Sequence, residues 1–303
     1  MTTKHDEDDD IAALPVIATD RAVARRLRDK VELVADGSKP ESLIESLRIL
    51  VAHGEVVRSF ARRSLKIRYK QSVLGVAWAV VQPLATLAIF VVFFGRVAKI
   101  SGGGVPYAAF AISALGPWQF VSNAISFGSL SVINEGALLR KVYFPRMAPV
   151  IGAVASNLVD LSIMLVLLLL LEPILGGQLG ASLVTVPLIV LVLVIPTLGL
   201  CLFLAGLAVF YRDLKYVVPF AVQFLMFASP VAYPISNIPS QWQLVYAAAN
   251  PWVGPVSAFR DVFALGTYPD WTLLGISAAT GFVMLFAGYE LFKHLEPEMA
   301  DVV

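Results

Sequence analysis

The sequence predicts an all-α membrane protein with six membrane-spanning helices, and three observations support that prediction. The chain is 58% hydrophobic and only 15% charged, whereas soluble domains carry about 25% charged residues. Uncharged apolar runs recur along it, and a run of about 18 residues or more can cross a bilayer as a helix. Clusters of Lys and Arg stand beside alternate ends of these runs, as expected where positive charge is retained in the cytoplasm.

The chain begins with a polar and acidic segment, residues 1–40, which opens MTTKHDEDDD. This composition excludes a cleaved signal peptide, so the first span must act as an uncleaved anchor. Acidic runs are usually solvated, and we expect a cytoplasmic tail that is disordered in part.

Residues 41–70 are predicted to form an amphipathic helix on the cytoplasmic surface of the membrane. Leu43, Leu47 and Leu50 recur at helical spacing, and acidic residues lie away from that stripe. Six basic residues follow without an acid among them: Arg58, Arg62, Arg63, Lys66, Arg68 and Lys70. On a continuous helix, all of them except Arg68 fall within an arc of roughly 140°. The cluster either attracts anionic lipid headgroups or also guides an anionic substrate to the membrane.

The transmembrane region, residues 71–295, contains six predicted spans: 72–95, 107–133, 147–171, 183–210, 217–235 and 271–292. The loop at 134–146 carries three basic residues and the turn at 211–216 carries two, whereas the loop at 172–182 carries only an acid. We therefore expect a bacterial inner-membrane protein with both termini in the cytoplasm, including the C-terminal residues 296–303.

Two segments depart from simple spans. The external stretch 235–265 is too apolar and aromatic for a solvated loop, and Pro239, Pro251 and Pro255 prevent one straight helix. We expect two short re-entrant helices there, between the fifth and sixth spans. In the second span, Pro117 predicts a break that other helices or a cavity must satisfy.

The sequence contains no signature of a catalytic or metal site. It lacks a phosphate-binding loop, an HExxH motif and a GxSxG motif, so this chain cannot hydrolyse ATP by the phosphate-loop route unaided. Cys201 is the only cysteine, and the three histidines are far apart in sequence, which disfavours a metal site. The basic residues cluster at membrane edges, which gives no support for nucleic-acid binding.

Asp160 is the one acidic residue deep within a predicted span, near Ser156 and Asn157. An ionisable group at that depth is a candidate functional residue. Ion-driven carriers commonly have several such groups, so we favour a structural role in helix packing, supported by hydrogen bonds to neighbouring polar side chains.

Aromatic and amide side chains offer a candidate path for a sugar, because flat rings pack on pyranose faces. The residues of this candidate glycan path are Trp118, Gln119, Asn123, Tyr233, Trp242 and Trp252. Trp and Tyr also gather at membrane interfaces for amphipathic reasons alone, so the external members have two explanations.

The cytoplasmic loop 134–146 is the candidate docking surface for a soluble partner. Its sequence, NEGALLRKVYFPR, ends in apolar and aromatic residues that we expect to be exposed. The candidate contact residues are Glu135, Leu138, Leu139, Arg140, Lys141, Tyr143 and Phe144. The alternative is a plain turn on the lipid surface.

Several of these segments, taken in order, resemble the permease subunit of polysaccharide-exporting ABC transporters, which export O-antigen, teichoic acid and related glycans. The matching segments are RSLKIRYKQSVLGVAWAVVQPL (63–84), LLRKVYFPR (138–146), YRDLKYVVP (211–219), SPVAYPISNIPSQW (229–242) and ANPWVGPVSAFRD (249–261). The resemblance covers about residues 42–295.

The resemblance implies a homodimer that pairs with two copies of a separate ATPase, into which the 134–146 loop docks. It implies no enzymatic activity and no cofactor in this chain, because the partner binds ATP and Mg. The amphipathic helix would form a gate for a glycan on an undecaprenyl-type lipid carrier. The carrier's diphosphate would then pair with Arg62, Arg63, Lys66 or Arg68.

Two other classes of protein fit the sequence less well. An ion-coupled secondary transporter would need embedded ionisable groups and usually internal repeats, and the chain offers one acid and no clear repeat. A membrane enzyme acting on lipid-linked sugars would need paired acids or a metal motif near an interface. Asp261 and Asp270 are the only external acids near each other, and they resemble loop residues.

Overall fold

The computed structural model describes residues 54–69, 75–136 and 144–299, and all regular structure within these ranges is helical. In chain order the elements are α3 (Gly54–Tyr69), η1 (Gly75–Ala77), α4 (Trp78–Phe90), η2 (Val91–Val97), α5 (Tyr107–Gly128), α6 (Ser131–Asn134), α8 (Ala148–Leu175), η3 (Ala181–Thr185), α9 (Val186–Phe210), α10 (Leu214–Phe227), η4 (Ile235–Asn237), α11 (Ser240–Ala249), α12 (Val253–Phe263) and α13 (Trp271–Leu295). The predicted tail, the first part of the amphipathic helix and the middle of the 134–146 loop lie outside the described residues.

Four helices in the described part of the chain are long and apolar enough to cross a membrane: Trp78–Val97, Ala148–Leu175, Ala181–Phe210 and Trp271–Leu295. They coincide with the first, third, fourth and sixth predicted spans. The second predicted span corresponds to α5, which has 22 residues but is less apolar. The fifth corresponds to α10, whose 14 residues are about 21 Å long against a hydrocarbon core of about 30 Å. These two spans stay predictions.

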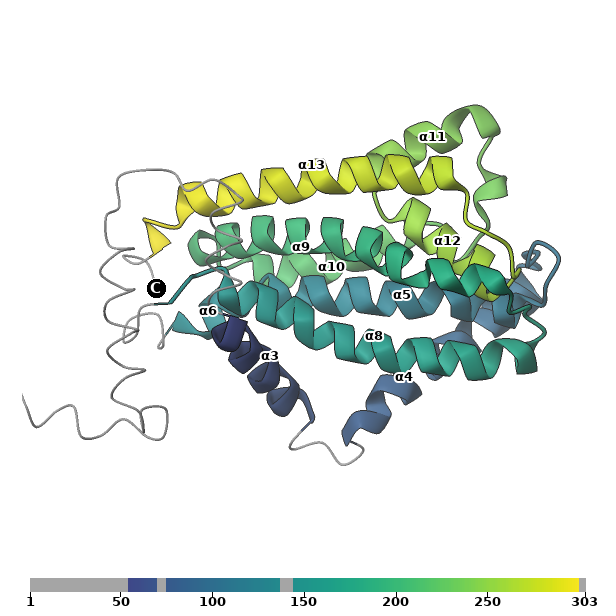
Figure 1. Ribbon diagram of the computed structural model, residues 1–303, viewed down its shortest axis with the longest axis horizontal. Helices are drawn as coiled ribbons and strands as arrows, with labels where there is room; N and C mark the ends of the chain where they lie inside the picture. The colour runs from purple at the N-terminus through teal and green to yellow at the C-terminus, as the bar shows by residue number, and fades with distance from the viewer. Residues whose placement is uncertain (1–53, 70–74, 137–143, 300–303) are drawn as a thin grey trace, which may run out of the picture. The chain divides into compact units, whose positions relative to one another are not determined.

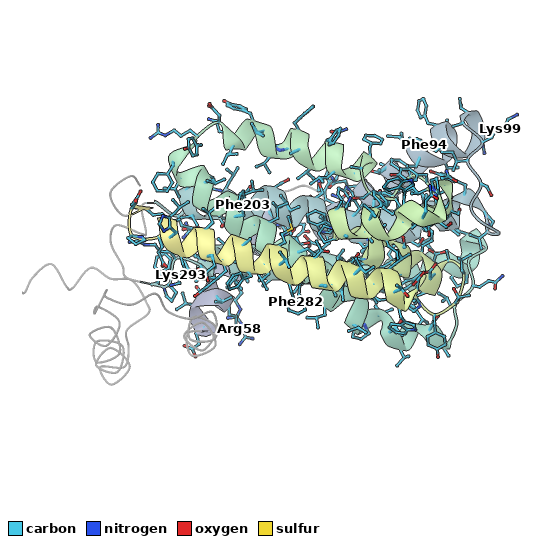
Figure 2. The ribbon with its side chains drawn as sticks, turned by 90° about the horizontal axis from the view of Figure 1, so that it is seen from above. Arg58, Phe94, Lys99, Phe203, Phe282 and Lys293 are labelled. Atoms are coloured by element: carbon cyan, nitrogen blue, oxygen red, sulfur yellow. The ribbon has the colours of Figure 1, made fainter. Side chains whose placement is uncertain are left out.

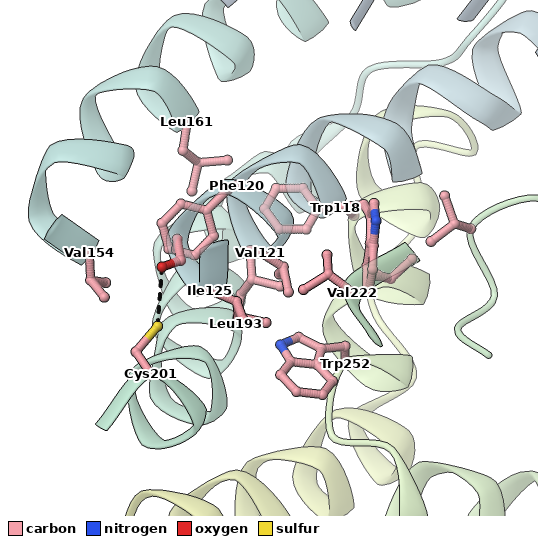
Figure 3. Close-up of a cluster of buried hydrophobic side chains, with 14 of the residues drawn as sticks. Trp118, Phe120, Val121, Ile125, Val154, Leu161, Leu193, Cys201, Val222 and Trp252 are labelled. Atoms are coloured by element: carbon pink, nitrogen blue, oxygen red, sulfur yellow. Dashed lines mark hydrogen bonds between the residues drawn. The ribbon is translucent and has the colours of Figure 1, made fainter. Parts of the chain in front are cut away.

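The helix α5 lies in the middle of the described bundle. It packs against α8 and α9, which run beside it (Figure 1), and it also contacts α4, α10 and α12. Gly116 leaves room for Met164 of α8, and Gly128 leaves room for Cys201 of α9. The helix continues unbroken through the buried Pro117, so the expected break is absent. Figure 3 shows its side chains Trp118, Phe120 and Ile125 among those of neighbouring helices.

The helices α9 and α13 form the most extensive helix–helix contact (Figure 1). At its centre, the position that a Cβ atom on Gly288 would take overlaps the carbonyl oxygen of Gly199. A Cβ on Gly199 would in turn lie 2.6 Å from the backbone N and Cα atoms of Leu285. The two backbones therefore touch, which is the close approach that small residues permit between membrane helices.

Charged and apolar residues are distributed along the bundle as a bilayer requires. Figure 2 shows Arg58 and Lys293 toward one end and Lys99 at the other, with Phe282 on the side between them. Phe282 on α13 is 56% exposed, as is Phe286 one turn later. An apolar lateral surface between charged ends is the pattern of a protein solvated by lipid.

The fifth predicted span, 217–235, is wrong in its second half, because α10 ends at Phe227. Pro230, which has no N–H group, follows two residues after the C-cap Ala228 and prevents the helix from continuing. The backbone carbonyls that the break leaves without helical partners are satisfied by side chains. The guanidinium of Arg260 donates to the carbonyls of Pro230 (2.8 Å) and Val231 (3.1 Å).

The predicted pair of short helices between the fifth and sixth spans is present as α11 and α12. Almost every residue of α12 is buried, including Arg260, and Asn250 before it donates to the carbonyl of Ala228 at 2.8 Å. Tyr246 on α11 donates to the same carbonyl at 2.7 Å. Side chains from this region therefore hydrogen-bond to the backbone carbonyls that follow α10, so the segment is not a free loop.

Candidate substrate-entry site and docking region

The helix α3 presents one basic face and buries the other. Arg58, Arg62 and Lys66 are exposed, whereas Phe60 is only 7% exposed and packs near the start of α8. A Cβ on Gly152 of α8 would lie 2.7 Å from the Cβ of Phe60 and 3.1 Å from the backbone nitrogen of Ala61, so this glycine lets the backbone of α3 approach α8. The 3.6-residue period thus leaves the cationic face free for an anionic ligand or headgroup.

The first end of the 134–146 loop is tied to α3 by an ion pair. Arg63 Nη1 donates to Glu135 Oε2 at 2.7 Å, with the Arg63 side chain 51% exposed and that of Glu135 13% exposed. Burial raises the pKa of Glu135, and the charge of Arg63 opposes this shift. Arg63 was predicted to meet the substrate and Glu135 the partner protein, and the structure joins them to each other.

The second end of the loop is also held by α3. The rings of Phe144 and Phe60 lie 5.1 Å apart, and Phe144 is only 8% exposed. The expectation that Phe144 is exposed for docking is therefore wrong, because α3 covers this ring. The other predicted docking residues, Leu138, Leu139, Arg140, Lys141 and Tyr143, lie outside the described residues.

Asp160 is the centre of a network that links α3 to α8. Arg68 forms a hydrogen-bonded ion pair with Asp160, and Tyr69 donates to the other carboxylate oxygen at 2.6 Å. The guanidinium of Arg68 also lies 4.4 Å from the centre of the Phe127 ring. Burial, followed by the bond to Asp160, raises the pKa of Tyr69 to about 12, so the phenol stays protonated and continues to donate.

This network refines two predictions. Asp160 has hydrogen-bond partners, but they come from α3, whereas the nearby Ser156 and Asn157 donate to the carbonyl of Ala153. Arg68, predicted to bind a diphosphate, points away from the basic face and toward α8. The sequence carried the signal, because Arg68 lies outside the helical arc of the other basic residues.

A cavity of about 230 Å³ opens beside this network, between α3, α4, α5 and α8. The residues that line it are Arg68, Tyr69, Trp78, Ala79, Gln82, Pro83, Gly116, Gln119, Phe120, Asn123, Phe127, Asp160, Leu161 and Met164. Its walls combine an ion pair, three amide side chains and several aromatic rings. Such a mixture of apolar walls with a few convergent polar groups is typical of a ligand site.

The structure places the residues of the candidate glycan path in different regions. Gln119 and Asn123 line the cavity, and Gln119 Nε2 donates to Asn123 Oδ1 at 3.2 Å. Trp118 and Trp252 are buried in the core shown in Figure 3, where the Trp252 indole donates to Thr197 Oγ1 at 3.1 Å.

The external members of that path lie apart from the cavity. Tyr233 shares a 3.0 Å hydrogen bond with Tyr246, and Trp242 is 56% exposed on α11.

Among the cavity residues that the sequence did not single out are Trp78, Gln82 and Phe127. The sequence did contain a signal for Gln82. An amide inside an otherwise apolar span costs free energy to bury in the membrane, and such residues are often functional. The two aromatic residues gave no comparable signal, since apolar rings are common in any span. Within the described ranges, no three His, Cys, Asp or Glu side chains gather in a way that could hold a metal ion.

Comparison with known proteins places these features in a family. Residues 55–264 match the model of the family described as ABC-2 type transporter. The chain is 29% identical, over 262 residues, to the O-antigen export system permease protein RfbA of Myxococcus xanthus, with 86% of this chain and 100% of that protein covered. It is 28% identical to the RfbA protein of Klebsiella pneumoniae, with 80% and 92% covered. It is 24% identical to the polysialic acid transport protein KpsM of Escherichia coli, with 80% and 94% covered.

Proposed function

The chain belongs to the ABC-2 type transporter family, and on that premise we propose that it is the permease subunit of an ATP-driven polysaccharide exporter. The observation that carries this proposal is the extent of the sequence match. The similarity to an O-antigen export permease extends over the whole of that protein and 86% of this chain. The matched region includes the basic helix α3, the cavity and the α11–α12 pair.

We place ATP hydrolysis in a separate subunit, because the sequence has no phosphate-binding loop. Two ATPase copies would dock on the 134–146 loops of a homodimer, and ATP and Mg would be bound there. Both described ends of the loop contact α3, through Glu135 to Arg63 and through Phe144 to Phe60. A displacement of the docked loop would therefore move α3 directly.

We propose that the substrate is a lipid-linked glycan that enters from the inner leaflet beside α3. The exposed Arg58, Arg62 and Lys66 offer a cationic surface, to which the diphosphate of an undecaprenyl-type carrier would bind. We also propose six spans with cytoplasmic termini in a bacterial inner membrane, a topology in which that face would lie in the cytoplasm. In the same topology, α11 and α12 would be re-entrant helices on the outer side.

Reconstitution tests this function. The permease and its cognate ATPase, in proteoliposomes loaded with lipid-linked glycan, should move the glycan to the opposite leaflet only when Mg-ATP is supplied. A variant ATPase that binds ATP without hydrolysing it is the control. Transport that persists without ATP and stops when an ionophore collapses the ion gradients would support the ion-coupled alternative and reject the proposal.

Charge reversal in the loop tests the docking step. Arg140→Glu combined with Lys141→Glu, or Tyr143→Ala alone, should uncouple ATP hydrolysis from export while the permease still forms a dimer. The same reversal at Arg212 and Lys215, in the other basic cytoplasmic turn, is the matched control. Export that remains intact in the loop variants would reject docking at this loop.

A further inference from the structure

We propose that the cavity between α3, α4, α5 and α8 binds one neutral sugar ring of the exported glycan, the ring attached to the lipid diphosphate. The diphosphate itself stays outside, on the basic face of α3. This inference rests on the proposed export function and adds to it a site for the sugar. It assigns Gln82, Gln119 and Asn123 to recognition of hydroxyl groups.

The amide groups of the cavity have hydrogen-bonding capacity that no described residue uses. Gln119 donates to Asn123, which uses one donor and one acceptor of the pair. Among the described residues, none bonds to the Asn123 amide nitrogen, the Gln119 carbonyl oxygen or the side chain of Gln82. Amides present donors and acceptors together, and sugar hydroxyls do the same. A polyhydroxy ligand can therefore satisfy every one of these groups.

Aromatic rings supply the flat apolar walls that a pyranose ring needs. Trp78 and Phe127 both line the cavity and are each 48% exposed. Exposed rings beside free amides are the combination that packs on the C–H faces of a sugar while its rim hydroxyls are bonded. The cavity volume of about 230 Å³ is below the usual range of ligand sites, so it fits one ring and not an oligosaccharide.

The charges of the cavity select a neutral ligand over an anion. The positive charge of Arg68 is already paired with Asp160, and its guanidinium is covered by the Phe127 ring. An incoming phosphate or carboxylate would meet the Asp160 carboxylate, and the described residues that line the cavity offer no unpaired cation to compensate it. The diphosphate is therefore better placed at the exposed charges of Arg62 and Lys66, which have no ion-pair partner among the described residues.

The position of α3 connects the two parts of the ligand. Lys66 on the basic face and Tyr69 at the cavity are three residues apart, which is about 4.5 Å along the helix axis and about 60° around it. A diphosphate held near Lys66 would therefore place the sugar that it carries near the cavity entrance. The same helix would thus contact both the lipid diphosphate and the first sugar of one substrate.

Binding to the complete transporter in lipid nanodiscs tests the proposal. The probes are a radiolabelled polyprenyl diphosphate, the same lipid carrying one N-acetylhexosamine, and the same lipid carrying one hexuronic acid. The variants are Gln119→Leu with Asn123→Leu in the cavity, and Arg62→Gln with Lys66→Gln on the basic face. Ser122→Ala, beside Asn123 but outside the cavity lining, is the matched control.

The wild-type transporter should bind the N-acetylhexosamine lipid about tenfold more tightly than the bare diphosphate, the gain of one or two hydrogen bonds. The amide variant should lose this tenfold gain and bind the bare diphosphate normally. The basic-face variant should weaken binding of both lipids by the same factor. The Ser122→Ala control should retain the full gain.

Three results would overturn the proposal: no difference between sugar-bearing and bare lipid in the wild type, equal weakening of both lipids by the amide variant, or tighter binding of the hexuronic acid lipid. The first indicates that the cavity holds no sugar, the second an anion site, and the third an acidic-sugar site. ATP-driven transport in proteoliposomes is measured independently. The export function can therefore stand when the sugar site fails, and the reverse pattern is equally visible.

Discussion

The contact between α9 and α13 is centred on backbone against backbone, whereas the contact between α3 and α8 combines a close approach at Gly152 with a hydrogen-bonded ion-pair network at Asp160. At the first, Gly199 and Gly288 allow no side-chain atom between the helices. At the second, Asp160 receives Arg68 and Tyr69, and a cavity lies beside them. The first contact can only stay or be lost, because close-packed shapes have no alternative arrangement. The second can exchange partners, which suits a helix that must respond to a substrate and an ATPase.

The largest effect should follow from a methyl group at the centre of the rigid contact. Gly288→Ala would place its Cβ on the carbonyl of Gly199 and force the helices apart, at a cost of about 3 kcal/mol. Thermal unfolding in detergent should show this loss. Gly275→Ala on the same helix is the control, since nothing lies within 4 Å of its Cβ position. Equal stability of the two variants would contradict backbone contact.

The next effect concerns the polar groups that close the end of α10. Arg260→Met should leave the carbonyls of Pro230 and Val231 without donors and destabilise the protein by about 2 kcal/mol. Arg260→Lys should recover part of this, because an ammonium can still donate to one of them. Unfolding midpoints of the two variants check the prediction, and a stable Met variant would show that water replaces the guanidinium.

A smaller effect is expected at the exchangeable contact. Asp160→Ala leaves Arg68 partly buried without its partner and should cost about 1.5 kcal/mol. Asp160→Asn should largely preserve export, because the amide oxygen still accepts from Arg68 or Tyr69. Unfolding midpoints and export rates of both variants check these expectations. Complete loss of export in a normally folded Asn variant would instead assign Asp160 a proton-transfer or gating role.

The smallest effect belongs to the ion pair at the loop. Arg63→Ala should cost about 0.5 kcal/mol, since half of the Arg63 side chain is exposed to solvent. Its larger consequence should be a weaker coupling of ATP hydrolysis to export. The charge swap Arg63→Glu with Glu135→Arg should restore coupling. The ratio of glycan exported to ATP hydrolysed should differ between the wild type and Arg63→Ala at low salt. The two ratios should converge at high salt, because salt screens an exposed ion pair.

Much of the fold could be predicted from the chain, because a bilayer imposes a length and a polarity on each span. The four long apolar helices coincide with predicted spans, and the proline-interrupted stretch 235–265 does form two short helices. The error at the end of α10 has a local cause in Pro230. The reason why this end is stable was not visible, since its donor Arg260 lies about thirty residues further along the chain.

The candidate site was predictable only in part. The basic face of α3 follows from helical spacing, and the amides Gln119 and Asn123 were chosen because they are polar in a span. Trp118 and Trp252 were predicted members of the same path, yet the structure buries both in the core. An aromatic residue carries no mark that separates a core position from a wall of a cavity.

By itself, the sequence determined that this protein is surrounded by lipid and where its basic segments lie. Both follow from hydropathy and charge, which can be read from short stretches of the chain. The tertiary structure alone decided which charges are free and which are paired. Arg68 meets Asp160 across 92 residues, and Arg63 meets Glu135 across 72. Those pairings depend on how α3 packs against α8, and no local pattern encodes the distance between two helices.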